Sequence, residues 1–234
     1  MGTPKPRTFG LLLFPHLTQL DLTGPYEVFR RVPEATVCLV WKNLEPVRAA
    51  GGLSILPTCS YGDHPPLDVL CVPGGPGQVE LMNDVQTLKF LQETAARAEL
   101  VTSVCTGSLV LGAAGLLQGY EATSHWSAVE QLSLLGATPV RSRTVWDRNR
   151  VTGAGVTSGI DFALDVVKRL YDESVARIIQ YQLEYEVDAS FPLHPKDAVL
   201  AGLVEKSKTS ALALRRMDAT RLAAQALKQA DNTP

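Results

Sequence analysis

Short apolar runs of strand length alternate with longer periodic segments along the chain, and no other feature limits the possible folds as strongly. Four runs are the clearest candidates for buried strands: TFGLLLF (8–14), TVCLVWK (36–42), LDVLCVP (67–73) and ELVTSVC (99–105). A run that is apolar at almost every position is typical of a strand covered on both faces. The sequence therefore predicts an α/β fold, a three-layer sandwich around a mostly parallel central sheet.

The segments between and after these strands have the spacing of helices. Segment 85–98 repeats its apolar residues every three or four positions, as an amphipathic helix does. The run SLVLGAAGLL is apolar all round, which indicates a buried helix, and we expect it to end at 118–119. Farther on, PVRSRTVWD and RVTGAG predict a hairpin that turns at 147–149. Further helices are predicted over 24–32, 157–171 and 173–186.

The length of the chain, 234 residues, is enough to bury a large core within one α/β domain. We expect a single domain over residues 1–234, with its core over about 7–186. A C-terminal helical extension is expected over 197–230, after the linker-like stretch PLHPKD (192–197).

Charge and hydropathy argue against two classes of partner, nucleic acids and membranes. The chain has 22 Lys and Arg against 24 Asp and Glu, a net charge of −2, so no overall field attracts nucleic acid or an anionic membrane. The N-terminal apolar run is too short to span a bilayer, and no small-residue cleavage site follows it. We expect a cytoplasmic protein that binds neither nucleic acid nor membrane.

The cysteines and histidines do not have the spacing of a metal site. The four cysteines are far apart and form no CxxC pair, so neither a zinc knuckle nor a disulfide framework is indicated. His16, His64 and His194 likewise show no ligand spacing. We expect reduced thiols, no metal and no organic cofactor.

Cys105 stands at the abrupt junction between the strand ELVTSVC and the helix that begins with TGSLVLG. A sharp turn from strand to helix presents its central side chain in the crevice where α/β sheets bind ligands. The helix N-terminus favours a negative sulfur, so we expect a lowered thiol pKa. The alternative is a buried structural cysteine, which is our interpretation of Cys38 and Cys71. The small and polar residues that follow, Thr106 and Gly107, favour a nucleophile.

The loop PGGPG (73–77) follows another predicted strand and contains three glycines. Without a Cβ, the amide of Gly74 or Gly75 can approach a reacting atom, and with the amide of Thr106 it can form an oxyanion hole. A tight turn before a helix explains the same segment equally well.

Asp21 is an isolated acid among leucines in LTQLDLTGP. It can cap the helix that follows, although Thr23 could do so instead. It can also act as a general acid and base whose protonation is tuned by burial and by a neighbouring thiolate. The sequence alone leaves both roles open. His125, in EATSHW, is interpreted as a packed residue rather than the activator of the thiol.

Several longer stretches resemble a known superfamily. The PGGPG loop and the strand-Cys-Thr-Gly-helix junction are similar to the ThiJ/PfpI superfamily, whose fold is flavodoxin-like and class I glutamine amidotransferase-like. Within it, four stretches resemble the bacterial isocyanide (isonitrile) hydratases: FPHLTQLDLTGPYEVF, SVCTGSLVLGAAGLLQG, TSHW and TGAGVTSGIDFAL. The resemblance extends from about Arg7 to Glu186.

This resemblance implies roles for individual residues. Cys105 is the expected nucleophile, Asp21 the acid and base beside the sulfur, and Thr106 a polar contact next to it. Val156, in GAGVTSG, is expected to line the same site. The implied reaction adds water to an isocyanide through a covalent cysteine thioimidate and gives an N-substituted formamide, with no cofactor. An aspartate at position 21 argues against the glyoxalase-like branches, where many members have a glutamate.

Other functions are compatible with the same residues. A glyoxalase-like hydratase would use the thiol on small 2-oxoaldehydes. A non-enzymatic stress or redox sensor would use oxidation of Cys105, with Asp21 stabilising the oxidised sulfur. A transcriptional regulator is a third class, but about 40 residues after Pro195 are too few for a paired helix-turn-helix module.

We also expect a homodimer, which the resemblance implies. Apolar residues of the last helices supply a surface that one domain does not need, although they could instead pack within the same subunit. They are Val199, Leu200, Leu203, Leu212 and Leu214.

Overall fold

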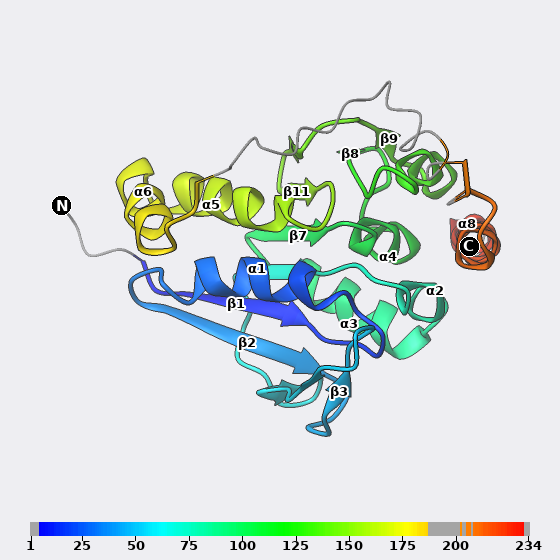
Figure 1. Cartoon of the computed structure of the whole chain (residues 1–234). Helices are drawn as coiled ribbons and strands as arrows, with labels where there is room; N and C mark the ends of the chain where they lie inside the picture. Colours follow the sequence, from blue (N-terminus) through cyan, green and yellow to red (C-terminus); the bar gives the residue numbers. More distant parts are fainter. Residues whose placement is uncertain (1–4, 187–201, 203–204, 207, 232–234) are drawn as a thin grey trace.

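A seven-stranded sheet forms the centre of the computed structural model, which describes residues 5–186, 202, 205–206 and 208–231 (Figure 1). All neighbouring strands are parallel except β10 and β11, which form the predicted hairpin. In spatial order the strands are β10 (Thr144–Asp147), β11 (Arg150–Gly153), β7 (Leu100–Val104), β6 (Val69–Val72), β1 (Arg7–Leu12), β2 (Ala35–Trp41) and β5 (Cys59–Ser60). The predicted α/β class and the mostly parallel sheet are confirmed.

The helices cover both faces of this sheet. The connection from β1 to β2 and the connection from β6 to β7 run in opposite directions along it, so right-handed crossovers place their helices on opposite faces. One layer contains α1 (Gln19–Phe29), α5 (Ser158–Leu170) and α6 (Glu173–Gln182). The other contains α3 (Val85–Ala95) and α4 (Gly107–Ala113). The three-layer, flavodoxin-like sandwich is therefore confirmed.

Shorter elements connect these layers. They are the helix α2 (Gln78–Leu81), the 3-10 helix η1 (Val129–Leu135) and the two-residue strands β3 (Val47–Arg48), β4 (Ser54–Ile55), β8 (Glu121–Ala122) and β9 (Thr138–Pro139). Strands β3 and β4 pair with each other, and so do β8 and β9. The segment EATSHW is therefore a strand only over its first two residues.

The core explains why the central runs are continuously apolar. All four residues of β6 and all five of β7 are buried. Phe9 of β1 stacks on Phe29 of α1 with ring centroids 4.5 Å apart, which fixes that helix against the sheet. Helix α3 starts where Asp84 accepts a hydrogen bond from the Thr87 amide at 2.8 Å.

Helices α1 and α4 differ most from their predicted limits, while α3 and α6 end three and four residues early, at Ala95 and Gln182. Helix α1 starts at Gln19, five residues before the predicted start, and contains Gly24 and Pro25. These residues usually mark a helix boundary, but here Gly24 permits close packing, since a Cβ there would lie 3.4 Å from Ile160 of α5. Helix α4 ends at Ala113 rather than 118–119, because Gly115 turns the chain at φ 75°.

Helix α8 (Ala211–Asp231) lies within the predicted C-terminal extension. It packs beside η1, α2 and α4 (Figure 1) and buries Ala219 and Ala223. Val199, Leu200 and Leu203 lie outside the described residues. The single-domain division of the chain stays a prediction. Among the helices that the structure describes, none has both the length and the apolar composition that a membrane-spanning segment requires.

Candidate active site

Cys105 occupies the turn between β7 and α4 and adopts a left-handed backbone conformation with φ 57°. Such a conformation costs about 1–3 kcal/mol for a residue with a side chain, so its surroundings must hold it in place. The Cys105 amide donates to the Gly153 carbonyl at 3.0 Å, and its carbonyl accepts from the hydroxyls of Ser108 at 3.2 Å and Ser124 at 3.0 Å. The predicted nucleophile elbow is present, and the side chain of Cys105 is buried.

Asp21 approaches this elbow from the first turn of α1 and is fully buried. Its Oδ2 accepts a hydrogen bond from the Gly74 amide at 3.2 Å, while Oδ1 has no hydrogen-bond partner in the part of the chain that the structure describes. Burial raises the pKa of Asp21 to about 6, and the neighbouring Cys105 thiol and Gly74 amide oppose this rise. The site therefore contains a carboxylate that can gain and lose a proton near neutral pH.

The capping role considered for Asp21 is wrong. The residue at the N-cap of α1 is Thr18, and no side chain caps that helix end. The Thr23 hydroxyl donates to Gln19 within the helix instead. Asp21 lies inside α1, two residues after its first residue, Gln19. From this position its carboxylate binds the Gly74 amide of the glycine loop.

The thiol of Cys105 has a raised pKa, which contradicts the lowered pKa that we predicted. Burial raises it first, and the nearby carboxylate of Asp21 raises it further. The Thr106 amide and the positive charge of Arg216 oppose this rise. The helix N-terminus acts as predicted, through the Thr106 amide, but desolvation and the carboxylate outweigh it. An ionised Asp21 therefore disfavours ionisation of the Cys105 thiol.

The glycine loop holds the other members of the site. The Gly75 amide donates to the Thr106 hydroxyl at 3.1 Å. A Cβ on Gly74 would lie 2.6 Å from the Thr106 nitrogen and 2.9 Å from Asp21 Oδ2, so only glycine fits. The amides of Gly74 and Gly75, considered as donors to an oxyanion, thus donate to the side chains of Asp21 and Thr106 in this structure. Their role in an oxyanion hole stays a prediction, since it requires exchange of these hydrogen bonds.

The remaining predicted residues lie in adjacent loops. Val156 is half-buried in the loop between β11 and α5, three residues after Gly153, which binds the Cys105 amide. The His125 Nδ1 is hydrogen-bonded to the Ser127 hydroxyl at 2.8 Å, and no hydrogen bond joins His125 to Cys105 in the described part of the chain. Burial and the charge of Arg216 lower the pKa of His125. This is consistent with a packed, neutral histidine.

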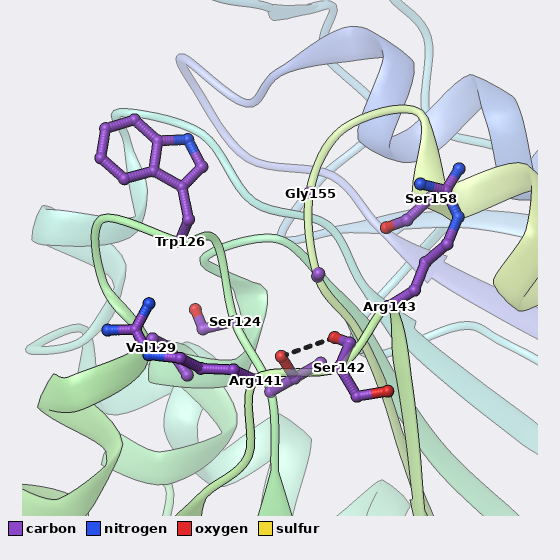
Figure 2. Close-up of a pocket in the computed structure, with 10 residues that line it drawn as sticks. Ser124, Trp126, Val129, Arg141, Ser142, Arg143, Gly155 and Ser158 are labelled. Atoms are coloured by element: carbon purple, nitrogen blue, oxygen red, sulfur yellow. Dashed lines mark hydrogen bonds between the residues drawn. The ribbon is translucent and has the colours of Figure 1, made fainter. Parts of the chain in front are cut away.

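A pocket of about 270 Å³ lies between the loop that follows β8 and the loop that follows β11 (Figure 2), and neither Cys105 nor Asp21 is among its lining residues. Ser124, which binds the Cys105 carbonyl, forms part of its wall, and the exposed ring of Trp126 lies above it. The Ser158 hydroxyl is buried in this wall and has no hydrogen-bond partner. The other residues that line the pocket are Thr123, Val129, Arg141, Ser142, Arg143, Ala154 and Gly155.

Sequence reasoning did not single out Ser124, Ser158 or Arg216. The two serines do lie within the stretches TSHW and TGAGVTSGIDFAL, where a search for hydroxyls beside the expected loops could have found them. No sequence pattern indicated that Arg216 is buried near the site, because a cationic residue on a long polar helix is usually exposed.

Among the described residues, no cluster of three or more His, Cys, Asp or Glu side chains could hold a metal ion. The expectation that the protein works without a metal stays a prediction.

Comparison with known proteins places this arrangement in a family. The sequence model of the DJ-1/PfpI family matches residues 9–169, which include Asp21, the glycine loop and the Cys105 elbow. The chain belongs to the DJ-1/PfpI family. The resemblance to the ThiJ/PfpI superfamily is therefore confirmed.

Individual DJ-1/PfpI relatives are similar over most of the chain. It is 50% identical to isonitrile hydratase of Pseudomonas putida over 202 residues, 86% of this chain and 89% of that protein. A crystal structure of a ThiJ/PfpI family protein from Pseudomonas syringae has a TM-score of 0.85 and 39% identity, covering 95% of this chain and 92% of that one. The transcriptional regulator GbdR of Pseudomonas aeruginosa is 29% identical over 78% of this chain, but only 52% of its own length is matched.

Proposed function

We propose that this protein is an isocyanide hydratase that converts isocyanides to N-substituted formamides through a covalent intermediate on Cys105. The observation that carries the proposal is the buried pair of Asp21 and Cys105, in which each group acts on the ionisation of the other. Such a pair can add sulfur and hydrogen to one carbon atom. The 50% identity to an isonitrile hydratase supports this choice of substrate.

In the first step, Asp21 accepts the thiol proton while the sulfur of Cys105 forms a bond to the terminal carbon of the isocyanide. Asp21 then delivers the proton to that carbon, which gives a thioimidate and regenerates the carboxylate. A carboxyl group suits both transfers, because its pKa of about 6 lies close to neutral pH.

In the second step, Asp21 removes a proton from water as the oxygen adds to the thioimidate carbon, and it passes that proton to the nitrogen. The tetrahedral intermediate then forms its carbonyl and breaks the carbon–sulfur bond, while Asp21 transfers the hydroxyl proton to the leaving sulfur, which releases the formamide and restores the thiol. The Thr106 amide stabilises the sulfur as it leaves, since it already lowers the pKa of the thiol.

The pocket lined by Ser124 and Gly155 is the proposed binding site for the substituent on the isocyanide nitrogen. One of its lining residues, Ser124, donates to the Cys105 carbonyl at 3.0 Å, and its volume of about 270 Å³ suits a small alkyl or aryl group. Trp126 would contact an aromatic substituent at the rim. Val156, the residue after Gly155, is proposed to limit its width.

The test is turnover of simple isocyanides, such as benzyl isocyanide, followed by the formyl proton signal of the product. We expect formamide formation that survives exhaustive chelation, and no conversion of methylglyoxal. Conversion of methylglyoxal alone would favour the glyoxalase-like alternative. Turnover of neither substrate, together with oxidation of Cys105 by peroxide, would favour the sensor.

The assembly and location of the protein are part of the same proposal. We propose a homodimer in which Leu214 and Leu222 of α8 contribute to the interface, because both side chains are more than half exposed. Leu212 packs instead against the core of its own subunit. A cytoplasmic location is supported by the four cysteines, which are all free.

A further inference from the structure

Arg216 of α8 is a buried cation beside the active site. The residue is buried, with only 7% of its surface exposed. Nη1 donates to the Ser127 hydroxyl at 3.2 Å, but Nε is buried and has no hydrogen-bond partner among the described residues. Burial of a charge with so few partners is unfavourable by several kcal/mol unless a compensating charge is nearby. A function is needed to explain why a guanidinium occupies this position.

No carboxylate forms an ion pair with Arg216 among residues 5–186 and 208–231. Three acidic side chains on α8 and on the elements packed against it form ion pairs with other arginines. The pairs are Glu80 with Arg215, Glu130 with Arg141, and Asp218 with Arg221. The positive charge of Arg216 is therefore not neutralised by its immediate neighbours.

Two charged groups act on the ionisation of the Cys105 thiol, and Arg216 is one of them. Cys105 interacts with the carboxylate of Asp21 from α1 and with the guanidinium of Arg216 from α8, and these act on its ionisation in opposite directions. The loop 124–127 connects Cys105 and Arg216, because the Ser124 hydroxyl donates to the Cys105 carbonyl at 3.0 Å and the Ser127 hydroxyl accepts from Arg216 Nη1 at 3.2 Å. His125 is hydrogen-bonded to the same Ser127 hydroxyl, and the guanidinium disfavours its protonation. Arg216 is thus the cation that remains near the sulfur while His125 is neutral.

We propose that Arg216 is a positioning residue of the active site, a fixed positive charge supplied by the C-terminal helix that stabilises the sulfur of Cys105 as it becomes an anion. In that step the S–H bond breaks, the proton passes to Asp21, and the electron pair stays on sulfur. Before the step the carboxylate carries the negative charge; after it, the sulfur does, at a position that Arg216 favours. Helix α8 lies outside residues 9–169, so this element would complete a site that the family core does not complete alone.

The proposal rests on the proposed function only in taking Cys105 as the nucleophile, and it can be tested without an isocyanide. The probe is iodoacetamide, and the readout is the rate of Cys105 alkylation in the full-length protein as a function of pH, resolved by peptide mass spectrometry. Resolution by peptide is needed because Cys38, Cys59 and Cys71 are also free.

Three variants separate charge from structure. Arg216→Gln removes the charge, and we expect alkylation at pH 8 to slow by about tenfold, with its pH midpoint raised by about one pH unit. Arg216→Lys keeps a cation, so we expect a rate within about threefold of the original protein. The matched control is Arg215→Gln, which removes the same charge from the adjacent exposed position of α8 and should leave the rate unchanged.

Two outcomes would overturn the proposal. One is an unchanged alkylation midpoint in a folded Arg216→Gln protein; the other is an equal shift in Arg215→Gln, which would reveal a general effect of net charge. If Arg216→Gln does not fold, the lysine variant decides: a folded Arg216→Lys protein with a tenfold slower rate would contradict a role based on charge. If the protein did not hydrate isocyanides, the alkylation results would still hold. The proposed function and the proposed role of Arg216 can therefore be rejected independently.

Discussion

Asp21 combines two properties that normally exclude each other, complete burial and ionisation near neutral pH. Its pKa rises from an ordinary value of 3.8 to about 6 because the carboxylate loses hydration inside the protein. The folded state therefore binds the proton more tightly than the unfolded state. The stabilising contribution of the protonated form is complete below about pH 4 and is lost as the pH rises through 6. At neutral pH the fold carries an unfavourable charge that the proposed reaction requires.

Replacement of Asp21 by Asn tests both properties at once. Asn keeps an oxygen that can accept from the Gly74 amide but cannot exchange a proton, so we expect turnover to fall by about 10²-fold or more. Because the variant carries no buried charge, we expect it to be more stable at pH 8, by roughly 1–3 kcal/mol in the free energy of unfolding. That difference should shrink as the pH approaches 4. Full activity in this variant would remove Asp21 from the mechanism and leave water or His125 as the proton source.

The pH dependence of turnover follows from the same group. Because Asp21 must be ionised to accept the thiol proton, we expect kcat/KM to be constant above about pH 7 and to fall about tenfold per pH unit well below 6. Measurements of kcat/KM over the pH range in which the protein stays folded will define this acidic limb of the pH profile. An acidic limb that persists unchanged in Asp21→Asn would assign it to a different group.

At the scale of elements, the site is assembled where four segments meet: α1, the glycine loop after β6, the turn after β7 and the loop after β11. Parallel strands bring their carboxyl ends to the same edge of the sheet, which is why residues far apart in sequence meet there. The Gly74 and Gly75 amides then tie the loop to Asp21 and Thr106.

The close approach at Gly74 predicts the effect of one methyl group. In Gly74→Ala the new Cβ would meet the Thr106 nitrogen and Asp21 Oδ2 within 3 Å, and we expect turnover to fall by about 10²-fold as these groups move apart. Gly62→Ala is the matched control, because a Cβ at that exposed position meets nothing within 4 Å. Equal activity of the two variants would show that the loop does not set the geometry of the site.

The sequence predicted those elements whose signal is local. Buried strands of a parallel sheet read as apolar runs, and the elbow at Cys105 follows from a strand that changes directly into a helix. The start of α1 was missed because Gly24 and Pro25 usually precede a helix, whereas here packing against α5 accommodates them. The direction of the Cys105 pKa shift was missed for a related reason: burial and the distance to Asp21 depend on segments 84 residues apart in the chain, and no local pattern records them.

At the scale of the whole molecule, α8 presents apolar side chains on its outer surface while its inner side chains pack against the core. Leu214 is 59% exposed and Leu222 is 56% exposed. We expect light scattering at micromolar concentration to give about twice the 25.3 kDa of one chain. Leu214→Glu should weaken this dimer, whereas Leu44→Glu, at a comparably exposed position remote from α8 in sequence, should not. A mass of one chain for the unaltered protein would reject the dimer.

The central claim, covalent hydration at Cys105, is tested most directly by the rate at which Cys105→Ala converts an isocyanide to its formamide. The account predicts a loss of at least about 10³-fold, because no other described cysteine lies at the turn between β7 and α4. Cys59→Ala, which removes a different buried cysteine, should keep full activity in the same assay. Turnover by a folded Cys105→Ala protein at a rate near that of the original enzyme would contradict the account.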